Sequence, residues 1–301
     1  MTRARAPGKV VVSGAYAVLA GAPAIVSAVS RYVTADTLRP AELVTDEVGA
    51  ALAPGEQAPW FDASELREQA RKLGLGSSAA ILVASLFALE QARDPSAERS
   101  QLLAHVKARA QAAHRRAQGG GSGIDVAASA VGGTLLYRLG PNGPSLRSVQ
   151  LPASLRIEVW TCPTSASTRE LLAAVAQLAR LEPALYARWM GAQILAAHDA
   201  GHAVARCDAP GFVQASRAQL RALSGLGAAA GAPIITPELA ALAPLAEKEG
   251  GALLPAGAGG GDIALFVGRG PSTSGLRAAL ENRAHRLLET ELSAPGVAVL
   301  P

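Results

Sequence analysis

Two glycines and two serines precede a long apolar run in the first third of the chain, and this combination can hold a phosphate group. Residues 71–80 read RKLGLGSSAA and lead into ILVASLFAL at 81–89. Gly74 and Gly76 let the backbone approach an anion closely, and Ser77 and Ser78 are expected to cap the following helix. The free N–H groups and the positive dipole end of that helix attract negative charge. We interpret the segment as a nucleotide triphosphate site; the alternative is an ordinary capped helix after a flexible turn.

A second glycine turn leads into one carboxylate. Residues 119–129 read GGGSGIDVAAS, which places Asp125 directly after a turn where backbone can approach a ligand. Phosphoryl transfer needs a positioned nucleophile and a proton acceptor, and an aspartate near a lysine supplies both. Asp125 is therefore our candidate base. The alternative is that Asp125 is the N-cap of the short helix that begins at 126.

Lysine is scarce in this arginine-rich chain, which contains only Lys9, Lys72, Lys107 and Lys248. Lys9 and Lys72 lie within glycine-containing motifs. Because a lysine ammonium is a compact point charge, these two positions suggest a task that arginine would not perform as well.

A third motif of small residues reads PAGAGGGDIALF at 255–266. Residues with little or no side chain let a loop approach a bound group, here the acceptor substrate or the triphosphate tail. The alternative is a flexible loop in which Asp262 only hydrogen-bonds the turn.

Other pairs of reactive residues carry less information. His198 and His202 are four residues apart on a predicted helix, but the segment lacks the glutamate of a zinc protease motif, so we predict a solvated helix face and no zinc. Cys162 and Cys207 have neither metal-ligand nor redox spacing, which favours reduced thiols.

Composition limits the class of protein. The chain has 301 residues, of which 50% are hydrophobic, which allows a substantial core and about two domains. Its net charge of +4 comes with scattered arginines and only 4% aromatic residues, so acidic small molecules are better partners than nucleic acid. The apolar runs are shorter than the ~20 residues of a membrane span, and the N-terminus lacks a signal-peptide pattern. These two features predict a cytoplasmic protein with no membrane partner.

Strand and helix patterns interleave along the chain, which predicts an α+β architecture. Residues 36–62 are expected to form irregular turns and short strands. Strands are predicted at 9–12, 24–26, 133–137, 156–160, 263–267 and 297–300, and helices after Ser78 and at 96–118, from 168, and at 184–206, 211–224, 237–249 and 274–292. The turn-rich stretch 140–144 is the expected boundary between domains at 1–150 and 151–301.

The three glycine motifs, in this order and preceded by APGK at 6–9, resemble the GHMP kinase superfamily over nearly the whole chain. Within it, the chain is most similar to the phosphomevalonate kinases. The segments that carry this similarity are 72–80, 113–129, 160–161, 165–168 and 236–239.

The resemblance implies a two-domain α+β GHMP kinase fold, with an N-terminal domain like ribosomal protein S5 domain 2, a C-terminal ferredoxin-like domain and a site in the cleft between them. It implies ATP-dependent phosphorylation of 5-phosphomevalonate to 5-diphosphomevalonate in isoprenoid biosynthesis. Asp125 would orient or deprotonate the acceptor phosphate, and Lys9 would neutralise charge. The residues implied for ATP are Lys72, Gly74, Leu75, Gly76, Ser77, Ser78 and Ala79, with Ser78 also assisting Mg²⁺; those for the phosphorylated acceptor are Lys9, Tyr16, Ser122, Gly123, Ser167, Thr168, Gly257 and Ala258.

Three departures from the family pattern leave the acceptor open. Ala15 stands where a glutamate is usual, Ala256 stands where a serine is usual, and Asp262 is followed by Ile263 instead of a cysteine and glycine. The alternatives are mevalonate kinase or another small-molecule GHMP kinase, the related diphosphomevalonate decarboxylase, and a GHMP-fold protein that binds ligand without turnover. Either a monomer or a homodimer is compatible with the sequence.

Overall fold

The computed structural model describes residues 2–68, 71–165 and 167–300, so Ala166 of the motif at 165–168 lies outside the described residues. The chain forms two compact units, each built from segments that are separated in the sequence. Unit 1 consists of Met1–Val10, Val26–Leu135 and Thr290–Pro301, and unit 2 of Val11–Ile25 and Leu136–Glu289. The boundary at 150/151 stays a prediction.

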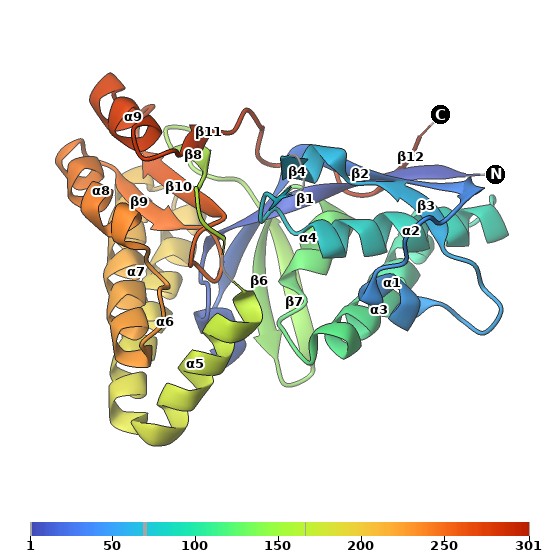
Figure 1. Cartoon of the computed structure of the whole chain (residues 1–301), viewed down its shortest axis with the longest axis horizontal. Helices are drawn as coiled ribbons and strands as arrows, with labels where there is room; N and C mark the ends of the chain where they lie inside the picture. Colours follow the sequence, from blue (N-terminus) through green and yellow to red (C-terminus); the bar gives the residue numbers. More distant parts are fainter. Residues whose placement is uncertain (1, 69–70, 166, 301) are drawn as a thin grey trace. The chain divides into compact units, whose positions relative to one another are not determined.

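The elements alternate between strands and helices along the chain (Figure 1). The strands are β1 (Arg3–Ser13), β2 (Ala24–Pro40), β3 (Pro59–Asp62), β4 (Arg67–Glu68), β5 (Arg71–Lys72), β6 (Thr134–Gly140), β7 (Gly143–Val149), β8 (Arg156–Thr161), β9 (Ala252–Pro255), β10 (Ile263–Gly268), β11 (Arg286–Leu287) and β12 (Ala298–Leu300). The helices are η1 (Ala17–Ala20), α1 (Asp46–Ala51), η2 (Ser64–Leu66), α2 (Ser77–Arg93), α3 (Arg99–Gln118), α4 (Ile124–Val131), α5 (Thr168–Leu181), α6 (Pro183–Ala205), α7 (Ala209–Ala230), α8 (Pro237–Lys248) and α9 (Ser274–Glu281).

One sheet has the strand order β12-β1-β2-β6-β7, with β3 paired to β2. Strands β1, β2 and β6 each begin in one unit and end in the other. In unit 1, the short strand β12 pairs antiparallel with the start of β1, with Arg3 opposite Leu300, so the last residues of the chain complete this edge of the sheet.

Helix α2 forms the centre of unit 1. Its residues 79–88 are all buried, as expected for a helix that is apolar on every side. It packs against α1, α3 and α4. Because α2 and α4 both begin directly after glycine loops, this packing brings the two loops into one compact unit.

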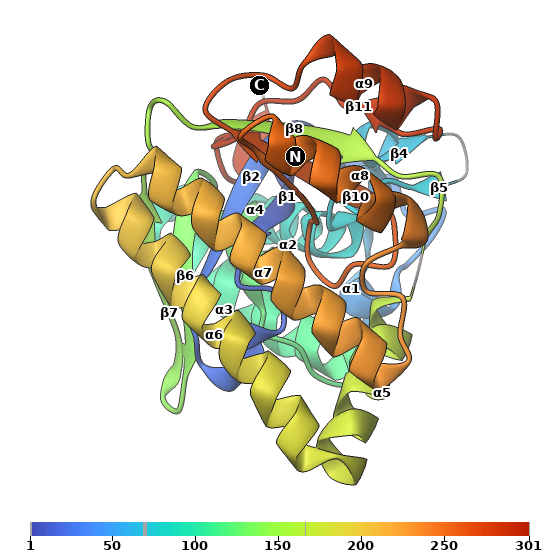
Figure 2. The ribbon, with the colours of Figure 1, turned by 90° about the vertical axis from the view of Figure 1, so that its left-hand side faces the viewer.

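Unit 2 contains a separate antiparallel sheet in the order β11-β8-β10-β9. Trp160 and Phe266 from this sheet pack with Leu242 of α8 and Leu276 of α9 in one apolar cluster. The long helices α6 and α7 lie side by side (Figures 1 and 2), and α5 packs against both. Gly225 of α7 lies against the Trp189 ring, where an added Cβ would come within 2.4 Å of the ring.

Most predicted elements are confirmed within a few residues, and three predictions are wrong. Residues 36–62 are not simply irregular, because β2 extends to Pro40 and α1 forms where Thr45 accepts a hydrogen bond from Val48 N at 3.3 Å. The last predicted helix ends at Glu281 instead of 292, because Leu287 turns back to pair with Trp160. Helix α7 continues to Ala230 instead of ending at 224.

Residues 140–144 include the connection between the neighbouring strands β6 and β7. Cys162 is buried and Cys207 is exposed, and neither forms a disulfide. Within the described part of the chain, no helix combines the length and apolar character that a membrane crossing requires.

His285 follows α9 and is buried in unit 2, which leads to a prediction about pH. Burial lowers the pKa of His285, and this effect outweighs the raising effect of the Arg283 and Leu280 backbone carbonyls. The unfolded chain therefore binds this proton more readily than the folded chain. The free energy of unfolding should therefore fall by up to about 1.4 kcal/mol per pH unit as the pH drops below about 6.5, the ordinary pKa of histidine.

Chemical denaturation between pH 7.5 and 5 checks this expectation. His285→Leu should flatten the decline of the unfolding free energy with falling pH, whereas the same change at the exposed His202 should not. An unchanged slope in His285→Leu would contradict the assignment.

Candidate active site

Lys9 and the first glycine loop lie against each other in unit 1. Lys9 is on β1, and its backbone N–H donates to the Leu75 carbonyl at 2.8 Å. The side chain is 11% exposed. Strand β1 therefore holds this lysine directly beside the loop that leads into α2.

Gly76 is the N-cap of α2 and has a left-handed backbone, with φ of 75°. A Cβ added there would come within 2.7 Å of Lys9 Cε, so the position needs glycine both for its conformation and for the passage of the lysine stem. Ser77 and Ser78 occupy the first turn, which makes our prediction that they cap α2 wrong. Because glycine has no side chain, the N-cap leaves the first-turn N–H groups free to meet a ligand.

Lys9 also meets the candidate base. Its Nζ is 3.3 Å from Asp125 Oδ1, and the aspartate side chain is 31% exposed. Asp125 lies in the first turn of α4, whose N-cap is Gly123, so the alternative in which Asp125 caps the helix is wrong. The carboxylate instead forms an ion pair with Lys9 and keeps an accessible side.

The remaining candidate site residues in unit 1 include Ser122, Leu75, Ala79 and Lys72. Ser122 lies beside the start of α4, where its Oγ is 3.4 Å from Ile124 N. Leu75 and Ala79 are buried. Lys72 is exposed at the end of β5, opposite Arg67. Unit 1 thus brings Lys9, the loop at 74–78 and Asp125 together.

Tyr16 belongs to unit 2 and has a strained backbone, with φ of 62°. Its hydroxyl donates to the Ala258 carbonyl at 2.7 Å, which joins the first motif to the third glycine loop. Burial raises the pKa of Tyr16 well above its ordinary value, so the phenol stays a neutral donor. Since the hydroxyl is engaged by Ala258, Tyr16 can position that loop.

Two buried glutamines, which the sequence reasoning missed, fix the turn before Tyr16. Gln219 of α7 accepts from Gly14 N at 2.8 Å and donates to Ser13 Oγ at 2.9 Å. Gln193 of α6 donates to the Ala15 carbonyl at 3.0 Å. In the sequence, the signal that could have identified these two residues is an amide side chain on an otherwise apolar helix face. Such contacts maintain a strained turn in one conformation.

The third glycine loop is held by backbone contacts in unit 2. Gly260 N donates to the Ile234 carbonyl at 2.9 Å, and Asp262 N donates to the Thr164 carbonyl at 2.9 Å. A Cβ at Gly261 would come within 2.5 Å of the Thr164 carbonyl oxygen, whereas Gly257 has open space around it. The loop is therefore tightly packed at the Gly261 end, whereas the end near Ala258 has open space beside it.

Ser167 and Thr168 are exposed at the start of α5. Ser167 is its N-cap and accepts from Glu170 N at 3.4 Å, and Thr168 is its first residue. Tyr16 packs in the same apolar cluster as Leu171, one turn further along α5. Unit 2 therefore places the start of α5, Tyr16 and the loop at 257–262 in one region.

Glu47 is a further residue that the sequence reasoning missed, because α1 is too short to show helical periodicity. It accepts from Gln118 Nε2 at 3.0 Å. Burial acts to raise the pKa of Glu47, but the hydrogen bonds from Gln118 and Ser78 help to hold it below its ordinary value. This carboxylate thus connects α1 to the end of α3.

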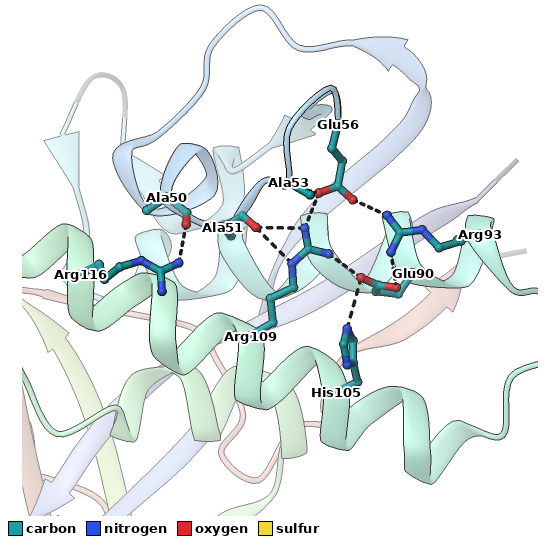
Figure 3. A network of polar contacts seen from close by, with 9 residues as sticks. All are labelled: Ala50, Ala51, Ala53, Glu56, Glu90, Arg93, His105, Arg109 and Arg116. Atoms are coloured by element: carbon teal, nitrogen blue, oxygen red, sulfur yellow. Dashed lines mark hydrogen bonds and ion pairs between the residues drawn. The ribbon is translucent and has the colours of Figure 1, made fainter.

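An ionic network anchors α1 in this position (Figure 3). Arg109 of α3 donates from Nη2 to the Ala51 carbonyl at 2.9 Å, and Arg116 donates to the Ala50 carbonyl at 2.6 Å. Arg109 also pairs with Glu56 and Glu90. Cations at the carbonyl end of a helix are favourable, so the arginines fix α1 and with it the Glu47 side chain.

Residues 64–133, which contain the loop at 74–78 and Asp125, match the GHMP kinases N terminal domain. The phosphomevalonate kinase of Streptomyces sp. (strain CL190) is 29% identical, with the match covering 87% of this chain and 88% of that protein.

Solved structures confirm the mixed α+β fold over nearly the whole chain. A Lin0012 protein from Listeria innocua has a TM-score of 0.80 at 23% identity, covering 99% of each chain. The Streptococcus pneumoniae phosphomevalonate kinase, solved with phosphomevalonate and AMPPNP, has a TM-score of 0.76 at 20% identity, covering 97% of this chain and 100% of that one. The chain therefore contains a segment that matches the GHMP kinases N terminal domain, and over nearly its whole length it has the mixed α+β fold of the solved GHMP kinases.

Proposed function

We propose that the chain transfers the γ-phosphoryl group of ATP to 5-phosphomevalonate and gives 5-diphosphomevalonate, as a cytoplasmic enzyme of the mevalonate pathway. The observation that carries the proposal is the contact of Lys9 with both Gly76 and Asp125, because it joins a phosphate-binding loop to a candidate base. The similarity to the Streptomyces phosphomevalonate kinase supports this acceptor over other small alcohols.

The chemistry assigned to these residues is positioning and charge neutralisation, which dominate phosphoryl transfer. The loop at 74–79, with Lys72, would bind the triphosphate. Asp125 would orient the acceptor phosphate and take its proton, and the Lys9 ammonium, 3.3 Å from Asp125, would offset the charge that develops between the two phosphates.

Hydroxyls and small residues are the candidates for holding the acceptor. Ser122 and Gly123 precede Asp125, and Ser167 and Thr168 begin α5. Gly257 leaves open space beside Ala258, whose carbonyl is fixed by Tyr16.

The residues around Ser78 fit a magnesium ion, since hydroxyl and carboxylate oxygens are the donors it prefers. Ser78 would help hold Mg²⁺, and the bound ion would neutralise the phosphate charges.

An ADP-release assay with mevalonate, phosphomevalonate and homoserine as acceptors tests the proposal. We expect the highest kcat/KM with phosphomevalonate, because a basic protein with an ammonium at the site favours an acceptor that carries phosphate. Equal or better turnover of mevalonate or homoserine would overturn the acceptor assignment. Release of carbon dioxide from diphosphomevalonate would instead identify a decarboxylase.

A further inference from the structure

The backbone at Tyr16 forms a γ-turn of the rare kind that has a positive φ. Tyr16 has φ of 62° and ψ of −50°, and Ala17 N donates to the Ala15 carbonyl, two residues earlier, at 2.7 Å. This turn is strained, and strain of this kind persists only where the surrounding structure over-determines it. The contacts that hold the turn therefore indicate what the strain serves.

Two fully buried glutamines hold the turn from two different helices. Gln219 of α7 accepts from Gly14 N at 2.8 Å and donates to Ser13 Oγ at 2.9 Å. Gln193 of α6 donates to the Ala15 carbonyl at 3.0 Å, while its own Oε1 is buried with no hydrogen-bond partner among the described residues. An unsatisfied buried oxygen is unfavourable. Packing alone would favour an apolar residue there, so the amide of Gln193 is best explained by its contact with the turn.

The turn determines the direction of the Tyr16 side chain. The ring is 4% exposed and packs with Leu171 of α5 and Leu223 of α7. Its hydroxyl donates to the Ala258 carbonyl at 2.7 Å. Because a side chain in a close-packed cluster has little room to move, the position of the turn decides where the hydroxyl meets the third glycine loop.

The Tyr16 contact restrains the open end of the third glycine loop. Further along the loop, Gly260 N donates to the Ile234 carbonyl at 2.9 Å. Gly257, by contrast, has open space around it, and Ala258 is the residue next to it. The hydroxyl of Tyr16 therefore holds the loop directly beside the space that the proposed function gives to the acceptor.

We propose that Gln193 and Gln219 are positioning residues for the phosphorylated acceptor. They hold the strained turn in the one conformation that directs the Tyr16 hydroxyl to Ala258, and they act on acceptor binding through that contact. The inference rests on the proposed function, because that proposal assigns Gly257 and Ala258 to the acceptor.

A double-mutant cycle between Gln219→Met and Tyr16→Phe tests this role. Methionine has a similar length without the two hydrogen bonds, and phenylalanine lacks only the hydroxyl. Each single change should raise KM for phosphomevalonate about tenfold, the effect of one lost hydrogen bond. Because Gln219 acts through Tyr16, the double variant should stay within about twofold of the single variants, whereas independent effects would multiply to about 100-fold. Both kcat and AMPPNP affinity should change less than about threefold.

Ser216→Ala is the matched control. Ser216 is buried on the same helix as Gln219, and its hydroxyl donates to the Phe212 carbonyl of that helix at 2.9 Å. The change removes a buried polar group without altering the turn, so KM should change less than about twofold. Thermal unfolding checks that each variant folds. Gln193→Met, which removes one donor, provides a second cycle with Tyr16→Phe if Gln219→Met does not fold.

Fluorine NMR gives a readout that does not depend on turnover. The chain has four tyrosines. In protein labelled with 3-fluorotyrosine, the Tyr16 signal is the one that Tyr16→Phe removes. Gln219→Met should shift or broaden this signal, and Ser216→Ala should leave it unchanged.

An unchanged KM or an unchanged Tyr16 signal in Gln219→Met would overturn the inference. Multiplied effects in the cycle would do the same, as would a loss of AMPPNP affinity as large as the rise in KM. These results leave the proposed function standing if the unmodified protein prefers phosphomevalonate. If it prefers another acceptor, the proposed function fails, and the same cycle with that acceptor still decides the role of the glutamines.

Discussion

Asp125→Asn is expected to lower kcat for ADP release by about 10³-fold, the middle of the range for removal of a general base. Asparagine has nearly the same shape but cannot accept the proton. It also removes the negative charge 3.3 Å from the Lys9 ammonium, so the lysine loses the partner that orients it. The measurement is steady-state ADP release with saturating ATP and phosphomevalonate.

The position of Asp125 makes this result specific to chemistry. The side chain is 31% exposed at the start of α4, so the substitution should leave the fold and AMPPNP affinity largely intact. Asp199→Asn, which changes an exposed aspartate of α6, should keep full activity. If Asp125→Asn retained more than a tenth of the activity, the residue would not be the base.

Gly76→Ala should have the second large effect, on nucleotide binding as well as stability. The left-handed backbone costs a residue with a Cβ about 1–2 kcal/mol. In addition, the new methyl group would lie 2.7 Å from Lys9 Cε, and the lysine has little freedom to move because it is buried and paired with Asp125. We expect AMPPNP affinity to fall at least tenfold and kcat to fall with it.

Gly231→Ala separates the two causes. Gly231 ends α7 with a comparable left-handed conformation, at φ of 62°, but a Cβ there meets nothing within 4 Å. It should lower the unfolding free energy by a similar amount without affecting AMPPNP binding. Equal AMPPNP affinities for the two variants would show that the Lys9 contact is unimportant.

The glycine positions illustrate what local chemistry can predict. Gly76, Gly119 and Gly123 each adopt a left-handed backbone at a helix end, and glycine is the residue that does so at little cost. The helical periodicity of residues 102–117 likewise predicted α3, which begins at Arg99 and ends before Gly119. The serine caps failed because sequence spacing alone does not decide whether glycine or serine takes the N-cap position.

Residue types and spacing therefore determined the helix ends, the loops of small residues and the kinase family that they resemble. The tertiary structure alone decided that Lys9 meets Asp125, that Gln193 and Gln219 fix the turn before Tyr16, and that Gln118 donates to Glu47. The physical reason is that backbone preferences act within a few residues, whereas the partner of a side chain depends on strand register and helix packing between segments far apart in the chain.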